Sequence, residues 1–404
     1  MDNFNKSLID ILDEPSVWQS FLLYKTEREH FSRREEAALV NFINSVGYLP
    51  CTERLKQGLG FDYPKKHLIN KLNGNKKRIV YSFTDEENQV LKLLAYLLYK
   101  YDDKQSSGCY SFRRNFGAHV AIKSILATPN IEKMWCYKTD ISDYFNSIKI
   151  PLLLPILRDI IGEDLKLYNF FEQILTSDFS FYEGKLIKEK RGVMAGTPIS
   201  PFLANIYLRE LDDIFANMVY ARYSDDIIVF AESQEDLKLY KQKISEIITE
   251  YGLTLNHKKE YVSMPGESWE FLGVSFKNGT IDLSIATRQK IKGKIRRKAR
   301  ALRRWMLYKN AEIERAMKAM IRAFNKKFYD KGESSDLTWS RWFFPLLTDT
   351  CGLKEIDNYL QQYIRYIPCG GFKKANYRID YKKLKECGYR SLVNEYYKGG
   401  SVKN

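Results

Sequence analysis

One stretch constrains this chain more than any other: it runs from Val219 to Phe230 and reads V-Y-A-R-Y-S-D-D-I-I-V-F. Apolar and aromatic residues recur with strand-like spacing on both sides of Ser224, Asp225 and Asp226, which predicts a hairpin with two adjacent carboxylates at its turn. Paired aspartates at such a place indicate metal binding. On their own, however, the same residues are more typical of a solvated turn, because Ser and Asp commonly hydrogen-bond their own backbone there.

A second stretch with strand-like spacing lies upstream at residues 133–146 and reads K-M-W-C-Y-K-T-D-I-S-D-Y-F-N. The alternation places Asp140 near the end of a strand, before the chain turns at Ser142 and Asp143. Two Mg²⁺ ions about 3.5–4 Å apart need oxygen ligands from separate elements, and such a pair stabilises both the attacking and the leaving oxygen of a phosphoryl transfer. The two stretches together therefore predict a phosphoryl-transfer site.

These motifs resemble those of bacterial reverse transcriptases of the group II intron-like lineage. The resemblance covers about residues 75–275 in the family's order, and it is strongest to the defence-associated branches, the abortive-infection and unknown-group enzymes. The matching segments are Asp140 with Phe145, the second motif Gly192–Leu208 (G-V-M-A-G-T-P-I-S-P-F-L-A-N-I-Y-L), the Y-x-D-D motif Tyr223–Asp226, the next motif Gly252–Lys259, and the primer grip Phe271, Leu272 and Gly273.

The resemblance implies an α+β fold of the right-hand polymerase type, with fingers, a palm that contains an antiparallel sheet, and a basic helical thumb. A helical extension is expected before the fingers, because apolar residues recur there at spacings of three and four. The expected domains are the N-terminal helical extension (1–49), the fingers (50–132), the catalytic palm (133–284), the thumb (285–332) and a C-terminal tail or thumb extension (333–404).

The resemblance also implies the catalytic roles. Asp140, Asp225 and Asp226 are expected to hold two Mg²⁺ ions, with the backbone carbonyl of Ile141 as an additional ligand. Lys259 is expected near the departing pyrophosphate, where an ammonium group can donate a proton or stabilise developing charge. The alternative for Lys259 is an exposed lysine with no catalytic role.

Cationic side chains on the fingers are expected to neutralise the triphosphate of the incoming nucleotide. Residues 76–82 resemble the first finger strand of the family, and residues 110–115 resemble its G-F-R-x-x-R/N element. Arg113 is the first candidate, followed by Lys77 and Arg78, and the alternative for each is a solvated charge or a generic phosphate contact. Phe145 matches the steric gate of the family, a bulky ring that excludes a 2′-hydroxyl and so favours dNTPs over rNTPs. The alternative, packing in the core, is compatible with that role.

Ala195 and Gly196 complete the expected dNTP site. Glycine allows close backbone approach, so a substrate base or a template strand can lie against Gly196. Many relatives have Pro-Gln-Gly where this chain has Met194, Ala195 and Gly196. Because this chain has no glutamine amide there, the sequence does not predict which group makes the usual contact to the incoming nucleotide.

Charge is concentrated in residues 286–328, which contain sixteen lysines and arginines against two glutamates, within a chain of net charge +15. Apolar residues recur there at three and four, which predicts two amphipathic helices. Such a density indicates binding to a nucleic-acid backbone, although a charge run is usually a solvated face. The residues chosen for phosphate contact are Arg296, Arg297, Arg300 and Arg304.

The six cysteines form no C-x-x-C motif, which fits a reducing cytoplasm, and no segment reaches the length of about 18 apolar residues that a membrane span needs. We therefore expect a cytoplasmic protein with no membrane partner. Its tail mixes tyrosines with basic residues, and protein-linked priming from Tyr396 or Tyr397 is an open alternative.

The predicted function is RNA-directed DNA synthesis. The expected partners are a structured, dedicated non-coding RNA as template, a primer, the cDNA product and dNTPs, and the family resemblance suggests antiviral (anti-phage) defence. An oligomer or an effector protein is left open. The alternatives are template-independent DNA synthesis, which Ala195 keeps open, and a non-catalytic RNA-binding protein, against which the three intact aspartates argue.

Overall fold

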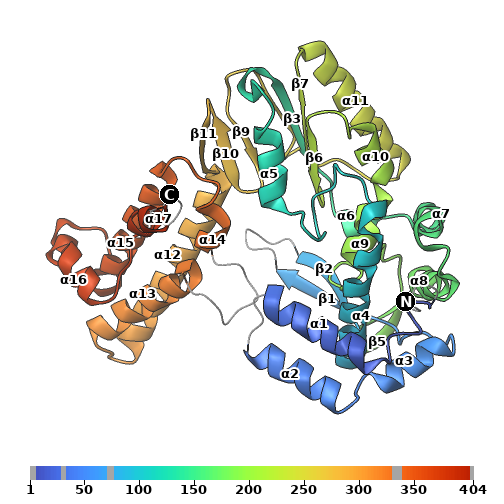
Figure 1. Ribbon diagram of the computed structural model, residues 1–404. Coiled ribbons are helices and arrows are strands. Elements are labelled where there is room, and N and C mark those ends of the chain that lie inside the picture. Colours follow the sequence, from blue (N-terminus) through green and yellow to red (C-terminus); the bar gives the residue numbers. More distant parts are fainter. Residues whose placement is uncertain (1–5, 29–32, 71–76, 330–338, 401–404) are drawn as a thin grey trace. The chain divides into compact units, whose positions relative to one another are not determined.

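The computed structural model describes residues 6–28, 33–70, 77–329 and 339–400 (Figure 1). The chain divides into two compact units, Met1–Pro265 and Gly266–Asn404. This division falls inside the predicted palm, because residues 266–284 form a small sheet that belongs to the second unit. Lys76 of the predicted finger strand and residues 333–338 of the predicted tail lie outside the described residues. The overall class is α+β with antiparallel sheets, as the sequence predicts.

The first unit begins with the predicted helical extension. Helix α1 starts at Pro15, whose fixed φ suits a first helical turn. Trp18 is fully buried, its indole nitrogen donates to the Leu12 carbonyl at 2.7 Å, and its ring stacks on Tyr48 at 4.8 Å. The helices of this extension are α1 (Pro15–Arg28), α2 (Arg33–Asn44) and α3 (Leu49–Lys56).

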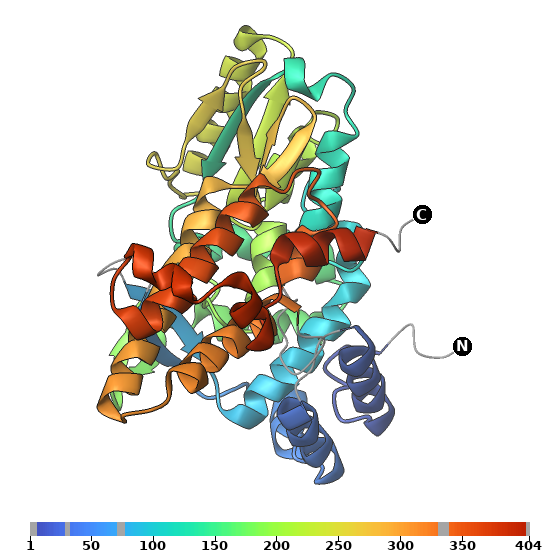
Figure 2. The same ribbon diagram turned by 90° about the vertical axis from the view of Figure 1, so that its left-hand side faces the viewer.

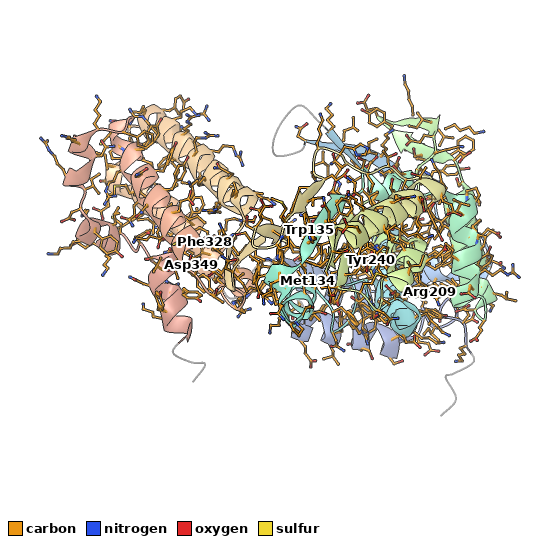
Figure 3. The ribbon with its side chains drawn as sticks, turned by 90° about the horizontal axis from the view of Figure 1, so that it is seen from above. Met134, Trp135, Arg209, Tyr240, Phe328 and Asp349 are labelled. Carbon is orange, nitrogen blue, oxygen red and sulfur yellow. The ribbon has the colours of Figure 1, made fainter. Side chains whose placement is uncertain are left out.

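The sheet that carries the predicted aspartates has the order β6-β7-β3-β8, and all of its pairs are antiparallel. The inner strand β7 is apolar and buried after its first residue, and helix α11 packs against both β7 and β3 (Figure 1). Figure 3 labels Trp135 on β3 and Tyr240 on this helix. The elements are β3 (Trp135–Asp140), β6 (Tyr220–Tyr223), β7 (Asp226–Ala231), β8 (Tyr261–Ser263) and α11 (Gln234–Glu250).

A second sheet of the first unit has the order β2-β1-β4-β5 and contains the predicted finger strand as β2. Its pairs are antiparallel except β1 with β4, which run parallel. The strands are β1 (Lys65–Asn70), β2 (Lys77–Ser82), β4 (Phe179–Tyr182) and β5 (Lys185–Lys188). The remaining helices of the unit are α4 (Asp85–Leu97), η1 (Leu98–Lys104), α5 (Ala118–Leu126), η2 (Ile131–Lys133), α6 (Tyr144–Ser147), α7 (Ile150–Ile161), α8 (Leu165–Thr176), α9 (Ser200–Tyr207) and α10 (Arg209–Ile214).

The second unit joins a three-stranded antiparallel sheet to a group of helices. The two amphipathic helices predicted in the basic segment are confirmed as α12 and α13, and α15 packs against both (Figure 2). Their apolar faces are buried, and Figure 3 labels one core residue of α13, Phe328. The elements are β9 (Trp269–Phe271), β10 (Val274–Lys277), β11 (Thr280–Leu283), α12 (Ile285–Tyr308), α13 (Ile313–Tyr329), α14 (Trp339–Phe343), α15 (Cys351–Cys369), η3 (Lys374–Arg378), α16 (Tyr381–Glu386) and α17 (Leu392–Gly400).

None of the helices in the described part of the chain is both long enough and apolar enough to cross a membrane.

Candidate active site

The three predicted aspartates meet at one end of the sheet that contains β3 and β7. Asp140, the last residue of β3, lies directly opposite Asp226, the first residue of β7. Asp225 lies in the two-residue turn between β6 and β7, and its carbonyl accepts the backbone N–H of Ile141 at 2.9 Å. The predicted hairpin is therefore present, and its turn is fastened to the end of β3.

A buried arginine beneath the turn fixes the shape of this hairpin. Arg222 is fully buried, and its Nε and Nη2 donate to the two carboxylate oxygens of Asp212 at 2.8 and 2.5 Å. Its Nη1 donates to the Ser224 carbonyl at 3.2 Å, and Ser224 has a φ of 61°, a left-handed conformation that costs about 1–2 kcal/mol outside glycine. Removing one partner of a buried ion pair typically costs about 3–5 kcal/mol. Arg222 and Asp212 thus position the aspartates, and sequence reasoning missed both.

Asp140 is held from a third segment, the one that resembles the motif at residues 252–259. The Asn256 side chain donates to Asp140 Oδ1 at 3.1 Å, and its backbone N–H donates to the Asp140 carbonyl at 2.7 Å. Lys259 Nζ lies 2.6 Å from Asp140 Oδ2, although its side chain is 60% exposed. The structure therefore brings Lys259 to the aspartates, and it adds Asn256, which sequence reasoning had not singled out.

The carboxylates at this end of the sheet are buried and close together, which disfavours their charged forms. Burial, reinforced by the charges of Asp140 and Asp226, raises the pKa of Asp225 to about 6. Burial also raises the pKa of Asp226, against which Lys138 acts from 3.5 Å. Burial alone would lower the pKa of Lys259, but its bond to Asp140 outweighs that effect and leaves the pKa raised.

The donor set fits a divalent cation in its chemistry. Carboxylate oxygens are the ligands that Mg²⁺ prefers, and a cation would stabilise the charged form of Asp225, which burial and the neighbouring aspartates disfavour. In the described residues, however, no three His, Cys, Asp or Glu side chains are grouped closely enough to hold a metal ion as they stand. Lys259 and Lys138 instead pair with Asp140 and Asp226.

Phe145 lies on the short helix α6 that follows Asp140, half-buried and edge-on to Tyr144 at 5.7 Å. Its carbonyl accepts the backbone N–H of Val193 at 2.9 Å. Gly192 makes this contact close: its φ is 53°, and a β-carbon there would lie 2.3 Å from the Phe145 carbonyl oxygen. The segment that begins at Gly192 thus packs closely against the backbone of Phe145. A larger residue at position 192 would clash with that backbone.

Ala195 and Gly196 contact other parts of the protein. The Ala195 backbone N–H donates to the Asn146 side chain at 3.2 Å, and its carbonyl accepts the Tyr81 N–H at 2.8 Å. Gly196 has a φ of 101°, and a β-carbon on it would meet Val80 of strand β2 at 3.1 Å. In this structure strand β2, and not a substrate, therefore lies against Gly196.

The candidate cations of the fingers differ in their surroundings. Arg113 donates from Nη1 to the carbonyls of Ser106 and Cys109, at 2.5 and 2.9 Å, and from Nη2 to the Asp102 carbonyl at 2.8 Å. These bonds commit its guanidinium to the loop 102–109, because backbone carbonyls occupy both terminal nitrogens. Lys77 and Arg78, by contrast, are exposed at the start of β2.

The predicted primer grip lies in the second unit. Phe271 ends β9, and Leu272 and Gly273 form the turn to β10, with φ of 48° and 90°. The Gly273 carbonyl accepts from the Thr287 hydroxyl at 2.9 Å, which ties the turn to the start of α12.

The four predicted phosphate-binding arginines, Arg296, Arg297, Arg300 and Arg304, are all exposed on α12. Other cations of the same helix are occupied: Arg288 and Lys292 pair with Glu355, and Arg303 donates to the carbonyls of Ile367 and Pro368. The structure thus separates the arginines available to a ligand from those that hold α12 to α15.

A fold with these motifs in this order defines a polymerase-type nucleotidyltransferase. The chain belongs to the family described as reverse transcriptase (RNA-dependent DNA polymerase), which matches residues 66–276, more than half of its length. The matched region contains all three aspartates, Phe145 and Lys259.

Two curated proteins are similar to parts of this chain. The retron Ec86 reverse transcriptase of Escherichia coli is 26% identical over 200 residues, covering 48% of this chain and 57% of the relative. A putative COX1/OXI3 intron 1 protein of Saccharomyces cerevisiae is 21% identical over 254 residues, covering 48% of this chain and 30% of the relative. The matching regions therefore cover only 57% of the length of the first relative and 30% of the second.

Among solved structures, apo telomerase from Candida tropicalis is similar with a TM-score of 0.43 and 14% identity, covering 81% of this chain and 69% of that chain. Its form truncated from the C-terminal domain has a TM-score of 0.42 and 17% identity, covering 60% of each chain.

Proposed function

We propose that this chain is an RNA-directed DNA polymerase, which extends a primer 3′ end with deoxynucleotides along an RNA template. The observation that carries the proposal is the strand register that sets Asp140 opposite Asp226, with Asp225 in the adjoining turn. Family membership over residues 66–276 supports the same reaction. In that reaction the primer 3′-hydroxyl bonds to the α-phosphorus of a dNTP and pyrophosphate leaves.

In this proposal Asp140, Asp225 and Asp226, with the Ile141 carbonyl, hold two Mg²⁺ ions. Bound there, the ions would neutralise charge on the attacking and leaving oxygens. Asn256 positions Asp140 through bonds from both its side chain and its backbone. Lys259 is protonated at neutral pH, as lysines ordinarily are, and because its bond to Asp140 outweighs the effect of burial its pKa is raised further; in this proposal its ammonium is the acid that protonates pyrophosphate.

Selection of the nucleotide is proposed to rest on Phe145, the sugar gate, whose backbone is held by Val193 and Gly192. Of the finger cations, Lys77 and Arg78 are the better candidates for the triphosphate, since Arg113 is bonded to three carbonyls. Ala195 and Gly196 are proposed to shape the dNTP site through their backbone contacts to Asn146 and β2.

The exposed arginines of α12 are proposed to bind the phosphates of the template–primer duplex, and Phe271, Leu272 and Gly273 to contact the primer. Helices read an A-form duplex through its shape and phosphates, which suits a charged face without base-reading side chains. A dedicated structured RNA as template and a cytoplasmic location, which the scattered cysteines favour, are also proposed. A role in anti-phage defence is proposed from the resemblance to defence-associated enzymes.

A primer-extension assay with a defined RNA template, Mg²⁺ and four dNTPs tests the proposal. We expect full-length cDNA from the natural protein, and none from Asp140→Asn or Asp225→Asn variants that still bind the template–primer. RNA binding without extension by the natural protein would instead favour the non-catalytic class.

A further inference from the structure

A cavity of about 620 Å³ lies within the first unit, and none of the residues assigned above to catalysis or nucleotide binding line it. Its walls come from the segment 59–64, from α8 with Ser177 after it, from β4, and from Arg191. Its volume is within the range of small-molecule sites, about 300–1,000 Å³. The cavity is therefore large enough for a ligand of its own.

Arg191 is the notable polar residue of this wall, since it is only 4% exposed. Its Nη2 donates to the carbonyl of Ile174, in the last turn of α8, and to that of Ser177, the residue after the helix, so this nitrogen caps α8. Its Nη1 is buried and has no hydrogen-bond partner in the described chain, nor has the hydroxyl of Ser177 beside it. Two buried polar groups with unmet hydrogen-bonding capacity thus occur on one wall.

No carboxylate of the described residues forms an ion pair with Arg191; Glu189 and Asp178 favour its charged form from a distance, but burial outweighs them and lowers its pKa. Glu189, two residues away, is taken by Lys66, by the Ser180 hydroxyl at 2.6 Å and by the Tyr81 hydroxyl at 3.2 Å. Asp62 also lines the cavity, but its carboxylate pairs with Arg54 at 2.9 Å. Leaving a buried charge unpaired costs several kcal/mol, so a bound anion would stabilise this site.

Four aromatic residues, Phe61, Tyr63, Phe170 and Phe181, also line the cavity, and Phe179 packs beside Tyr63. Tyr63 lies 5.5 and 6.4 Å from the rings of Phe179 and Phe181, and Phe61 meets Phe170 edge-on at 5.3 Å. Tyr63 and Phe181 keep exposed area, so a planar group can reach them. Base stacking on aromatic side chains is worth about 1–3 kcal/mol per base and tolerates any base.

We propose that this cavity binds a nucleoside monophosphate, with its phosphate on Arg191 and Ser177 and its base against Tyr63 and Phe181. A guanidinium with one free terminal nitrogen suits a phosphate, which accepts charge-assisted hydrogen bonds in a fixed geometry. Arg191 directly precedes Gly192, so such a ligand would lie beside the segment that holds Phe145. This site is independent of the proposed polymerase reaction.

Isothermal titration calorimetry of the full chain with AMP in EDTA tests the proposal, because metal-dependent nucleotide binding at the aspartates is then silent. We expect AMP to bind, with adenosine and inorganic phosphate each at least ten-fold weaker. Arg191→Leu should weaken AMP at least ten-fold, while Arg191→Lys retains part of the affinity. Arg209→Leu removes a partnered surface arginine and should change nothing. Asp225→Asn should also keep AMP binding, which separates this site from the proposed catalytic one.

Since Arg191 also caps α8, its variants must first match the natural protein in thermal melting. If Arg191→Leu does not fold, Tyr63→Ala decides instead, because that side chain is exposed and its loss should weaken AMP several-fold without unfolding. AMP that does not bind, or that binds equally to the natural protein and to folded Arg191→Leu, overturns the proposal. The proposal is also overturned if adenosine binds as tightly as AMP, because adenosine has no phosphate for Arg191. It is likewise overturned if inorganic phosphate binds as tightly, because phosphate has no base for Tyr63.

Discussion

Lys259 Nζ lies 2.6 Å from Asp140 Oδ2, although the two residues are 119 positions apart in the chain. The segment that carries Lys259 is fastened beside Asp140: the Ser142 N–H donates to the Thr254 carbonyl, and Asn256 bonds Asp140 twice. These backbone and side-chain hydrogen bonds therefore position Lys259 beside Asp140. An ammonium group in that place can act in the reaction or merely balance charge, and the two roles have different kinetic consequences.

If Lys259 protonates the leaving pyrophosphate, Lys259→Ala should lower kcat about 100-fold, the usual size of a general-acid contribution. The Mg²⁺ concentration for half-maximal rate should not rise, because removing the ammonium frees Asp140 for the metal. Lys258→Ala is the matched control, since Lys258 is its exposed neighbour. Equal, small losses in the two variants would assign Lys259 to charge balance.

Phe145→Ala should increase incorporation of rNTPs relative to dNTPs, because the smaller side chain leaves room for a 2′-hydroxyl. The measurement is the ratio of kcat/KM for dATP and ATP on one template, and we expect at least a ten-fold change. Phe179→Ala, which removes an exposed ring on β4, serves as control. An unchanged ratio in Phe145→Ala would leave that ring with a packing role only.

Gly192→Ala tests how strictly the second motif supports the first. Both Gly192 and Gly184 have positive φ, 53° and 78°, but a β-carbon on Gly184 meets nothing within 4 Å, whereas one on Gly192 lies 2.3 Å from a carbonyl oxygen. Gly184→Ala should therefore cost only the backbone penalty of about 1–2 kcal/mol. Gly192→Ala should lower the melting temperature clearly more, and equal shifts in the two variants would contradict the contact.

Replacing Arg296, Arg297, Arg300 and Arg304 with glutamine should flatten the salt dependence of RNA binding. Each lost phosphate contact reduces the slope of log K against log [salt] by about 0.7–0.9, so four contacts would lower it by about 3. A matched variant with Arg288, Lys292 and Arg303 replaced removes cations that already have protein partners, and its slope should change little. A slope that does not change in the first variant would place the RNA elsewhere.

Local patterns in the sequence predicted the parts of this fold that rest on local spacing. The hairpin at Tyr223–Asp226, the strand ending at Asp140 and the two basic helices were all confirmed, because alternation and helical spacing are read within a dozen residues. The resemblance to a known family predicted which strands belong together, which no local pattern could supply.

Side-chain contacts that depend on how segments pack were not predicted from the sequence. Asn256 and Asp140 are 116 positions apart, and Arg222 and Asp212 form a buried pair within a stretch that reads as plain strand and helix. An arginine between apolar strand residues was the one signal for that pair. Arg113 resembled a phosphate ligand by motif, yet its neighbours are carbonyls of a loop that only the fold brings near.

The most direct test of the central claim is to sequence the DNA that the purified protein makes with its co-purifying RNA, Mg²⁺ and four dNTPs, with and without prior ribonuclease treatment. Asp225→Asn is the control for contaminating polymerases. We expect products complementary to one RNA, lost after ribonuclease and absent from the variant. Low-complexity DNA that persists after ribonuclease, or products that the variant makes equally well, would contradict RNA-directed synthesis by this chain.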